Sequence, residues 1–268
     1  MNRNNSPIGL FDSGVGGLTV ANAIRSVLPG EQLYYYGDTA HLPYGDKSKE
    51  TIISYSIGIS DFLLDQGCKV VLIACNSAST NAFQEVKEHV GGRAVVLNVV
   101  DPVIDYVTSL VEARNVGIIG TKATIDSKFY QTELSAKAPG MAVSSLATPL
   151  FVPMIEEGFV FDDISNAIIR AYLSRRELED IDTLILGCTH YPIIRNQISR
   201  FYNFGVNVLD TARIVAEYLR DYLTKNEMLA VQRAGADKFF VSDHTPSFEN
   251  IANMFFNEKI HLQKKSIW

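Results

Sequence analysis

The stretch that decides the fold is VLIACNSAST, residues Val71–Thr80, an apolar run that ends in a cysteine followed by hydrogen-bonding residues. A second stretch, TLILGCTHYP (Thr183–Pro192), has the same form. Continuous runs of Val, Ile and Leu are typical of strands that are buried on both faces of a parallel sheet. Both stretches therefore place a thiol, Cys75 or Cys188, where the chain leaves a buried strand.

Buried strands and helical segments alternate along the chain. Further apolar runs that end in polar or turn residues are PIGLFDSG (7–14), QLYYYGD (32–38) and AVVLNVVDP (94–102). Residues 49–67 have the apolar spacing of a helix and stop at a glycine. This alternation predicts an α/β fold with mainly parallel sheets covered by helices. Ligands of such sheets bind beyond the carboxyl ends of the strands.

The second half of the chain repeats the elements of the first half in the same order, at offsets of 108 to 113 residues. The matched pairs are NVGIIGTKATI with PIGLFDSGVGG, VSSLATPLFVPMIEEG with QLYYYGDTAHLPYG, TLILGCTHYP with VLIACNSAST, and NVLDTARIVAEYL with VVLNVVDPVIDYV. We therefore predict two pseudo-symmetric α/β domains with the active site in the cleft between them. The first domain is expected to comprise residues 1–99 plus about 210–228, and the second about 100–209 plus 229–268.

Composition disfavours several classes of protein. Of the 268 residues 47% are hydrophobic, and the net charge of −6 argues against nucleic acid and anionic membrane as partners. No apolar stretch reaches the roughly 18 residues of a membrane span, and the first ten residues lack the apolar core of a secretory signal. Three cysteines without a CxxC spacing are typical of a reducing compartment and do not suggest a metal site. We expect a cytoplasmic protein.

The paired thiols suggest acid–base chemistry. If equivalent strand ends face one cleft, Cys75 and Cys188 lie on opposite sides of a bound molecule. A thiol titrates near pH 8.5, so one cysteine can take a proton from a carbon while the other delivers a proton to its opposite face, which inverts the configuration. A single cysteine after a strand is more often a small core residue. We assign that role to Cys68, which lies at a strand start.

Polar residues at other strand ends are candidates for the same cleft. Asp12 can orient or deprotonate Cys75, bind a substrate ammonium group, or cap the next helix. The backbone N–H of Ser13 at a helix start suits an anion. His190 can polarise a thiol or help to bind a carboxylate. The other histidines are expected to be structural: His41, His89, His244 and His261.

Two loops correspond to each other in the two halves. Pro43, Tyr44 and Gly45 form a turn whose backbone can donate to a carboxylate, or which only reverses the chain. Glu156 lies in the corresponding loop of the second half. From the residues alone, it is more readily a solvated charge at a helix end.

Seven motifs taken together resemble one family. They are IGLFDSGVGGLTV, YYGDTAHLPYGDKS, ACNSAS, GTKATI, FVPMIEEG, LILGCTHYP and VLDTA. In this order they resemble the glutamate racemases of the aspartate/glutamate racemase superfamily, from about residue 7 to about residue 212 and more loosely beyond. The resemblance implies a cofactor-independent isomerase that interconverts L- and D-glutamate and supplies D-glutamate for peptidoglycan, hence for cell-wall biogenesis and cell shape. It also implies a homodimer.

The resemblance also assigns residues to roles. Cys75 and Cys188 would be the two acid/base thiols, assisted by Asp12, Glu156 and His190, so the resemblance replaces the solvated-charge interpretation of Glu156. Substrate contacts would fall on Asp12, Ser13, Pro43, Tyr44, Gly45, Asn76, Ser77, Thr121, Thr124, Thr189 and His190. At position 77 the family more usually has threonine, and the serine found here keeps the hydroxyl group.

Other functions remain open at this point. The GVGG segment after a strand, with Asp38 at a later strand end, is reminiscent of a dinucleotide-binding enzyme, but Thr19 stands where the third glycine belongs. A Cys–His hydrolase would use Cys188 with His190 and leave Cys75 without a role. A two-lobed binding module would explain the cleft but not the paired thiols. Aspartate racemase is the nearest enzymatic alternative within the superfamily.

Overall fold

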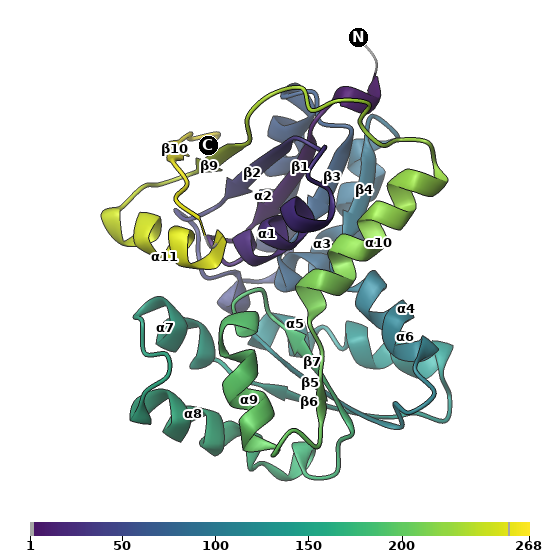
Figure 1. Cartoon of the computed structure of the whole chain (residues 1–268), viewed down its shortest axis with the longest axis vertical. Helices are drawn as coiled ribbons and strands as arrows, with labels where there is room; N and C mark the ends of the chain where they lie inside the picture. Colours follow the sequence, from purple (N-terminus) through teal and green to yellow (C-terminus); the bar gives the residue numbers. More distant parts are fainter. Residues whose placement is uncertain (1–2, 257) are drawn as a thin grey trace.

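The computed structural model describes residues 3–256 and 258–268 and contains two parallel sheets (Figure 1). The strands are β1 (Ile8–Asp12), β2 (Leu33–Gly37), β3 (Val70–Ile73), β4 (Val95–Asn98), β5 (Asn115–Gly120), β6 (Ala142–Ala147), β7 (Thr183–Gly187), β8 (Asn207–Val208), β9 (Lys238–Val241) and β10 (Leu262–Lys264). The first sheet has the order β10-β9-β2-β1-β3-β4 and the second β6-β5-β7-β8. Every pairing in both sheets is parallel.

Helices cover both sheets, as the alternation in the sequence predicts. They are α1 (Leu18–Val27), α2 (Lys49–Asp65), α3 (Asn76–Val90), α4 (Asp101–Ser109), α5 (Lys122–Asp126), α6 (Phe129–Lys137), α7 (Phe151–Glu156), α8 (Asp163–Leu173), α9 (Arg195–Phe201), α10 (Thr211–Lys225) and α11 (Pro246–Phe256). Short 3₁₀ turns lie at Arg3–Asn5, Tyr44–Asp46, Arg176–Leu178 and Tyr191–Ile194. All five residues of β1 and of β7 are buried, which explains their continuous apolar sequences.

The predicted pseudo-symmetry of the two halves is confirmed by the strand order. The order β2-β1-β3-β4 in the first sheet is repeated as β6-β5-β7-β8 in the second. β3 and β7 therefore occupy equivalent places, and each leads at its carboxyl end into a cysteine, Cys75 or Cys188. One hydrophobic cluster contains core residues of both halves, including Leu10 of β1 and Ile118 of β5.

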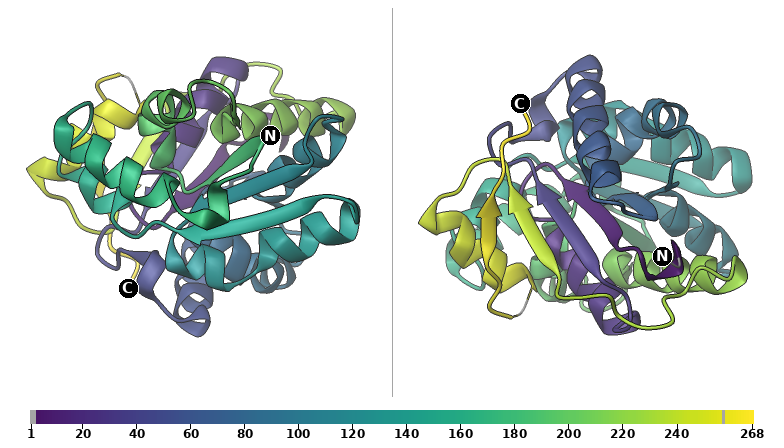
Figure 2. Two further views of the ribbon diagram at one scale, coloured as in Figure 1. Left: turned by 90° about the horizontal axis from the view of Figure 1, so that it is seen from below. Right: turned by 90° about the horizontal axis from the view of Figure 1, so that it is seen from above.

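The end of the chain lies in the first sheet, so the assignment of residues 229–268 to the second domain is wrong. β9 pairs with β2, with Tyr35 opposite Phe239, and β10 pairs with β9. Figure 2 (right) shows these yellow-green and yellow strands beside the purple strand β2. The physical reason is that β2 would otherwise leave an edge of unpaired backbone groups, which the apolar strand β9 covers. The other domain boundaries remain a prediction.

The side chain of Trp268, the last residue described, packs against residues of the first half. Its ring lies 5.2 Å, centroid to centroid, from the rings of both His41 and Tyr55. This packing depends on Gly58, because a β-carbon at residue 58 would lie 2.8 Å from the indole ring. Trp268 therefore packs between α2 and the loop that follows β2.

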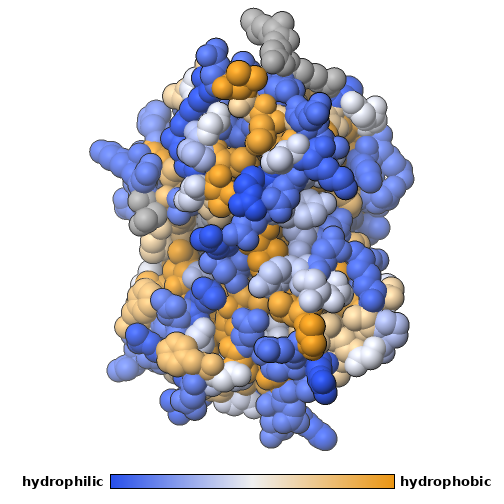
Figure 3. Space-filling view, turned by 45° about the vertical axis from the view of Figure 1, so that its right-hand side comes forward, coloured by the Kyte–Doolittle hydropathy of each residue, from blue (hydrophilic) through white to orange (hydrophobic). Residues whose placement is uncertain are grey.

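The described residues contain no helix that is long and apolar enough to cross a membrane. On the face shown in Figure 3, hydrophilic side chains cover most of the surface, and hydrophobic side chains occur between them in both halves.

Candidate active site

A cavity of about 40 Å³ lies between the two halves, at the carboxyl ends of β3 and β7. Its lining residues are Ser13, Gly14, Leu42, Pro43, Tyr44, Gly45, Cys75, Asn76, Ser77, Thr121, Val152, Glu156, Gly187, Cys188, Thr189 and His190. Ligand sites usually offer several hundred Å³, so the two halves lie closely around this one. Both cysteines singled out by the sequence line this cavity.

Cys75 connects β3 to α3 and is almost fully buried. Its sulfur lies 3.7 Å from Ser13 Oγ. Burial raises the pKa of the Cys75 thiol to about 12, and the nearby Asp12 carboxylate adds to the rise, while N–H groups of Ala78 and Ser13 oppose it. Cys75 is therefore a protonated thiol at neutral pH in this state of the protein.

Cys188 has a different set of neighbours. Its sulfur lies 3.7 Å from His190 Nδ1, and His190 Nε2 lies 2.9 Å from Glu156 Oε1 at the end of α7. Burial by itself lowers the pKa of His190, but the contacts with Cys188 and Glu156 outweigh burial and raise the pKa to about 10. His190 is therefore a cation at neutral pH, and it holds a positive charge beside the sulfur of Cys188.

Asp12 lies behind the cavity rather than on its surface. It is fully buried, and its carboxylate accepts hydrogen bonds from the Gly14 N–H at 3.1 Å and the Thr189 hydroxyl at 3.5 Å. Burial raises the pKa of Asp12, although the positive charge of His190 opposes the rise. Asp12 thus joins the end of β1 to the loop after β7 without lining the cavity.

Thr124 also lies outside the cavity lining. Its hydroxyl is 3.3 Å from Ser77 Oγ and 3.0 Å from Thr121 Oγ1, while Ser77 and Thr121 are 2.8 Å apart. Thr121 and Thr124 belong to the second half and Ser77 to the first. This hydroxyl cluster therefore ties the start of α3 to the start of α5.

The Pro43–Gly45 turn is anchored by a buried carboxylate. Tyr44 lines the cavity and donates its hydroxyl proton to Asp38 at 2.6 Å. Asp38 is fully buried and also lies 2.9 Å from His41 Nδ1. Asp38 therefore fixes the turn through the Tyr44 hydroxyl group, a role that the sequence did not indicate.

The glycine-rich segment after β1 packs against protein atoms. A β-carbon at Gly16 would lie 2.4 Å from two ring atoms of His190 and 2.6 Å from Thr189 Oγ1. Thr19 also donates a hydrogen bond of 2.8 Å to the Thr189 backbone oxygen. Gly16 thus serves a close contact between the halves, and this geometry disfavours the dinucleotide interpretation.

Four lining residues were not singled out from the sequence: Gly14, Leu42, Val152 and Gly187. None of them has a polar side chain, so residue chemistry alone does not mark them. Three are sequence neighbours of predicted residues, and that adjacency was the available signal.

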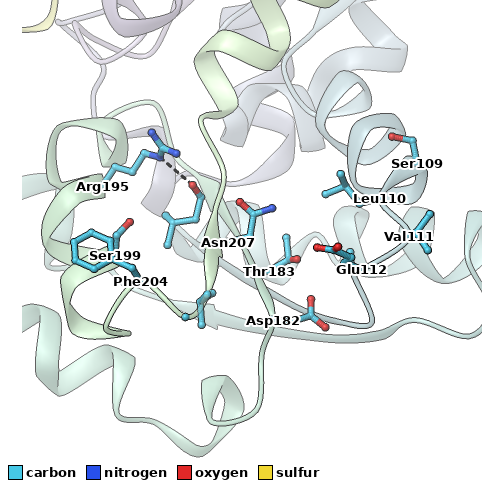
Figure 4. A pocket seen from close by; sticks show the side chains of 14 residues that line it. Ser109, Leu110, Val111, Glu112, Asp182, Thr183, Arg195, Ser199, Phe204 and Asn207 are labelled. Atoms are coloured by element: carbon cyan, nitrogen blue, oxygen red, sulfur yellow. Dashed lines mark hydrogen bonds between the residues drawn. The ribbon is translucent and has the colours of Figure 1, made fainter.

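A larger cavity of about 750 Å³ lies elsewhere, beside β8 (Figure 4). It is at the amino ends of β5 and β7, opposite to the edge where parallel sheets bind ligands. Two of its polar side chains serve the fold: Asp182 accepts from the Arg114 and Asn115 N–H groups, and Arg195 donates to the Val208 oxygen. The smaller cavity with the two thiols is therefore the candidate functional site.

Comparison with known proteins gives a consistent result. The family model for Asp/Glu/Hydantoin racemase matches residues 18–219. A glutamate racemase of Persephonella marina is 39% identical over 257 residues, covering 96% of each chain. The glutamate racemase of Francisella tularensis, solved in complex with D-glutamate, superposes with a TM-score of 0.91 at 37% identity, over 98% of each chain. An aspartate racemase of Picrophilus torridus shares the fold at 15% identity and a TM-score of 0.59, over 82% of this chain and 94% of its own.

Proposed function

Because the chain belongs to the glutamate racemase family within the Asp/Glu/Hydantoin racemases, we propose that it interconverts L- and D-glutamate by moving one proton at Cα. The observation that carries this proposal is the presence of Cys75 and Cys188, from equivalent strand ends of the two halves, in the lining of one cavity. Glutamate is the substrate because the relatives of substantial identity are glutamate racemases, whereas the aspartate racemase shares only the fold.

In the proposed reaction one cysteine begins as a thiolate and the other as a thiol. The thiolate takes the Cα proton, so a new S–H bond forms, the C–H bond breaks, and its electron pair remains on the substrate as a carbanion delocalised into the carboxylate. The opposite thiol then gives its proton to the other face of Cα. The protonation states of the two sulfurs are exchanged at the end, and no step of this scheme requires a cofactor.

The carbanionic transition state needs fixed hydrogen-bond donors around the substrate carboxylate. Donors available on the cavity surface are the side chains of Ser13, Asn76, Ser77, Thr121 and Thr189, with the Pro43–Tyr44–Gly45 turn opposite. The small volume of the cavity favours this role, because exclusion of water strengthens each of these interactions.

Each thiol has its own assisting group in this proposal. The protonated His190, held by Glu156, supplies a positive charge for Cys188 when it is a thiolate. For Cys75, hydrogen bonds from Ser13 and from the Ala78 N–H at the start of α3 favour the thiolate, although burial opposes its formation. Asp12 acts from behind the cavity, through Gly14 and Thr189, rather than by binding substrate directly.

A Cys–His hydrolase is the alternative, and the comparisons do not favour it because the relatives of substantial identity are glutamate racemases. The contacts of His190 with Cys188 on one side and Glu156 on the other resemble a nucleophile–base–carboxylate arrangement. It leaves Cys75 without a function in a cavity that it also lines. A hydrolase would accumulate an acyl-enzyme on Cys188, which mass spectrometry detects.

The racemase proposal is tested in D₂O with L-glutamate or D-glutamate, following circular dichroism and deuterium at Cα. The wild-type protein should racemise both enantiomers with deuterium incorporation, whereas Cys75→Ala and Cys188→Ala should each lose racemisation. Cys68→Ala is the matched control, because Cys68 is a buried thiol against Gly9 outside the cavity. Full turnover by either Cys75→Ala or Cys188→Ala would disprove the two-thiol mechanism.

The cellular role follows from the proposed reaction. D-glutamate made in the cytoplasm would enter peptidoglycan, so loss of the enzyme would affect the cell wall and cell shape. Growth of a depleted strain should be restored by supplied D-glutamate.

We also propose a homodimer. Its support is a set of large apolar side chains around α7 and α8 that are between 42% and 65% exposed: Leu150, Phe159, Phe161 and Ile164. Equilibrium sedimentation should give a dimer for the wild type and for Val231→Asp, which alters an exposed valine elsewhere, and a monomer for Ile164→Asp.

A further inference from the structure

Tyr130 forms a buried hydrogen bond that connects the second half to the active site. It lies in α6, is 3% exposed, and donates its hydroxyl proton to Asn76 Oδ1 at 2.8 Å. Asn76 belongs to the first half, follows Cys75 directly and lines the cavity, whereas Tyr130 is not a lining residue. A residue outside the site therefore holds the side chain of a residue inside it.

The direction of this bond decides which end of the Asn76 amide is left for a ligand. Asn76 Oδ1 is the only acceptor of the Tyr130 hydroxyl among the described residues, and none of them accepts a bond from Asn76 Nδ2. Burial raises the pKa of Tyr130 far above neutrality, so its hydroxyl keeps the proton and remains a donor. The amide oxygen is thus engaged, and the NH₂ group remains available as a donor.

A donor is what a carboxylate requires, because an ionised carboxylate can only accept hydrogen bonds. With the amide turned over, its oxygen would face the carboxylate and repel it. Without a partner, the two orientations of the Asn76 amide would compete, and only one of them would bind substrate.

From this geometry, and resting on the proposed function, we propose that Tyr130 is a positioning residue that holds the Asn76 NH₂ group toward the substrate carboxylate. Because the bond crosses between the halves, it forms only when they lie together. Ser77, the next residue of α3, also contacts the second half, because its hydroxyl lies 2.8 Å from the Thr121 hydroxyl. Closure of the halves therefore completes the carboxylate site in addition to bringing the second thiol close.

The test is a double-mutant cycle with steady-state kinetics on L- and D-glutamate. Tyr130→Phe removes one oxygen atom and leaves the ring in place. It should lower kcat/KM for glutamate about tenfold, because the Asn76 NH₂ group is one of the donors proposed to stabilise the substrate carboxylate in the transition state. The pH–rate profile should keep its shape. In an Asn76→Ala background, the same change should have no further effect, since the group that Tyr130 orients is gone.

The matched control is Tyr202→Phe, which also removes a buried hydroxyl, here one without a hydrogen-bond partner among the described residues. It should leave kcat and KM unchanged. Circular dichroism and the unfolding midpoint establish that each variant is folded.

If Tyr130→Phe keeps the wild-type kcat/KM, or if its effect adds in full to that of Asn76→Ala, the positioning role is wrong although racemisation stands. If the wild-type protein does not racemise glutamate, the proposed function fails and the positioning role fails with it.

Discussion

Gly16 packs so closely against His190 that a β-carbon at residue 16 would lie 2.4 Å from two atoms of the imidazole ring. Gly16 belongs to the first half of the chain and His190 to the second. The position of the imidazole beside Cys188 therefore depends on contact between the halves as well as on its own loop.

Gly16→Ala should lower kcat/KM for glutamate by more than tenfold, because the added methyl group must displace His190 or separate the halves. The protein should still fold, with a loss of about 1–3 kcal/mol in the free energy of unfolding, as is usual for overpacking. Gly30→Ala is the control, since a β-carbon at Gly30 meets no atom within 4 Å. Wild-type activity in Gly16→Ala would show that the position of His190 is not critical.

Glu156→Gln should remove the negative charge that stabilises the protonated His190, whose Nε2 lies 2.9 Å from Glu156 Oε1. The pKa of His190, which is about 10 in the intact site, should fall, and the limb of the pH–rate profile that reports on this proton should move to lower pH. We expect a decrease in kcat on the order of tenfold at neutral pH. Glu157→Gln, which changes the exposed neighbouring carboxylate, should leave the profile unchanged, and an unchanged profile in Glu156→Gln would contradict the assignment.

The stability of the protein should decrease as the pH rises above about 6.5. The pKa of His190 is raised from 6.5 to about 10 in the folded state, so the folded protein binds this proton more tightly than the unfolded chain does. The resulting stabilisation is complete below about pH 6.5 and is lost as the pH rises through about 10.

Urea denaturation from pH 6.5 to 9 measures this effect, with His190→Asn as the reference. Above this range the raised pKa of Cys75 acts in the same direction, so the comparison ends at pH 9. A free energy of unfolding that falls equally in both proteins would show that His190 is not the group responsible.

Lys69→Met should destabilise the protein without changing the active site. Lys69 forms a buried ion pair of 2.7 Å with Glu31 and donates to the backbone oxygens of Asn4 and Met228, at the amino end of β3. Its removal leaves a buried carboxylate without its partner, which costs about 3–5 kcal/mol. Lys264→Met, which breaks an exposed pair with Asp243, should cost less than about 1 kcal/mol. A similar loss in both variants would contradict the role of burial.

The sequence predicts the two halves and the shared position of the thiols because both depend on local patterns. Apolar runs specify buried strands, and the repeat specifies equivalent positions, so the sequence alone predicts that Cys75 and Cys188 share one cleft. The location of β9 could not be predicted in this way, because it has no counterpart in the repeat. Its place is decided by the open edge of β2, which is a property of the folded sheet.

The contacts that support the site could not be predicted from the sequence for a similar reason. The bonds from Tyr130 to Asn76 and from Tyr44 to Asp38 join residues whose types are common in cores and turns. The close approach of Gly16 to His190 depends on how the halves pack. Asp12 has the expected residue type, but tertiary packing sets it behind the cavity rather than in it.

The position of the Trp268 side chain has a practical consequence, because the chain contains a single tryptophan. Its indole lies against His41, which contacts the same carboxylate that anchors Tyr44. All tryptophan fluorescence thus originates at one point, next to the loop that carries the turn at the cavity. A change in the environment of this loop on ligand binding would therefore alter the intrinsic fluorescence, which is recorded without an attached dye.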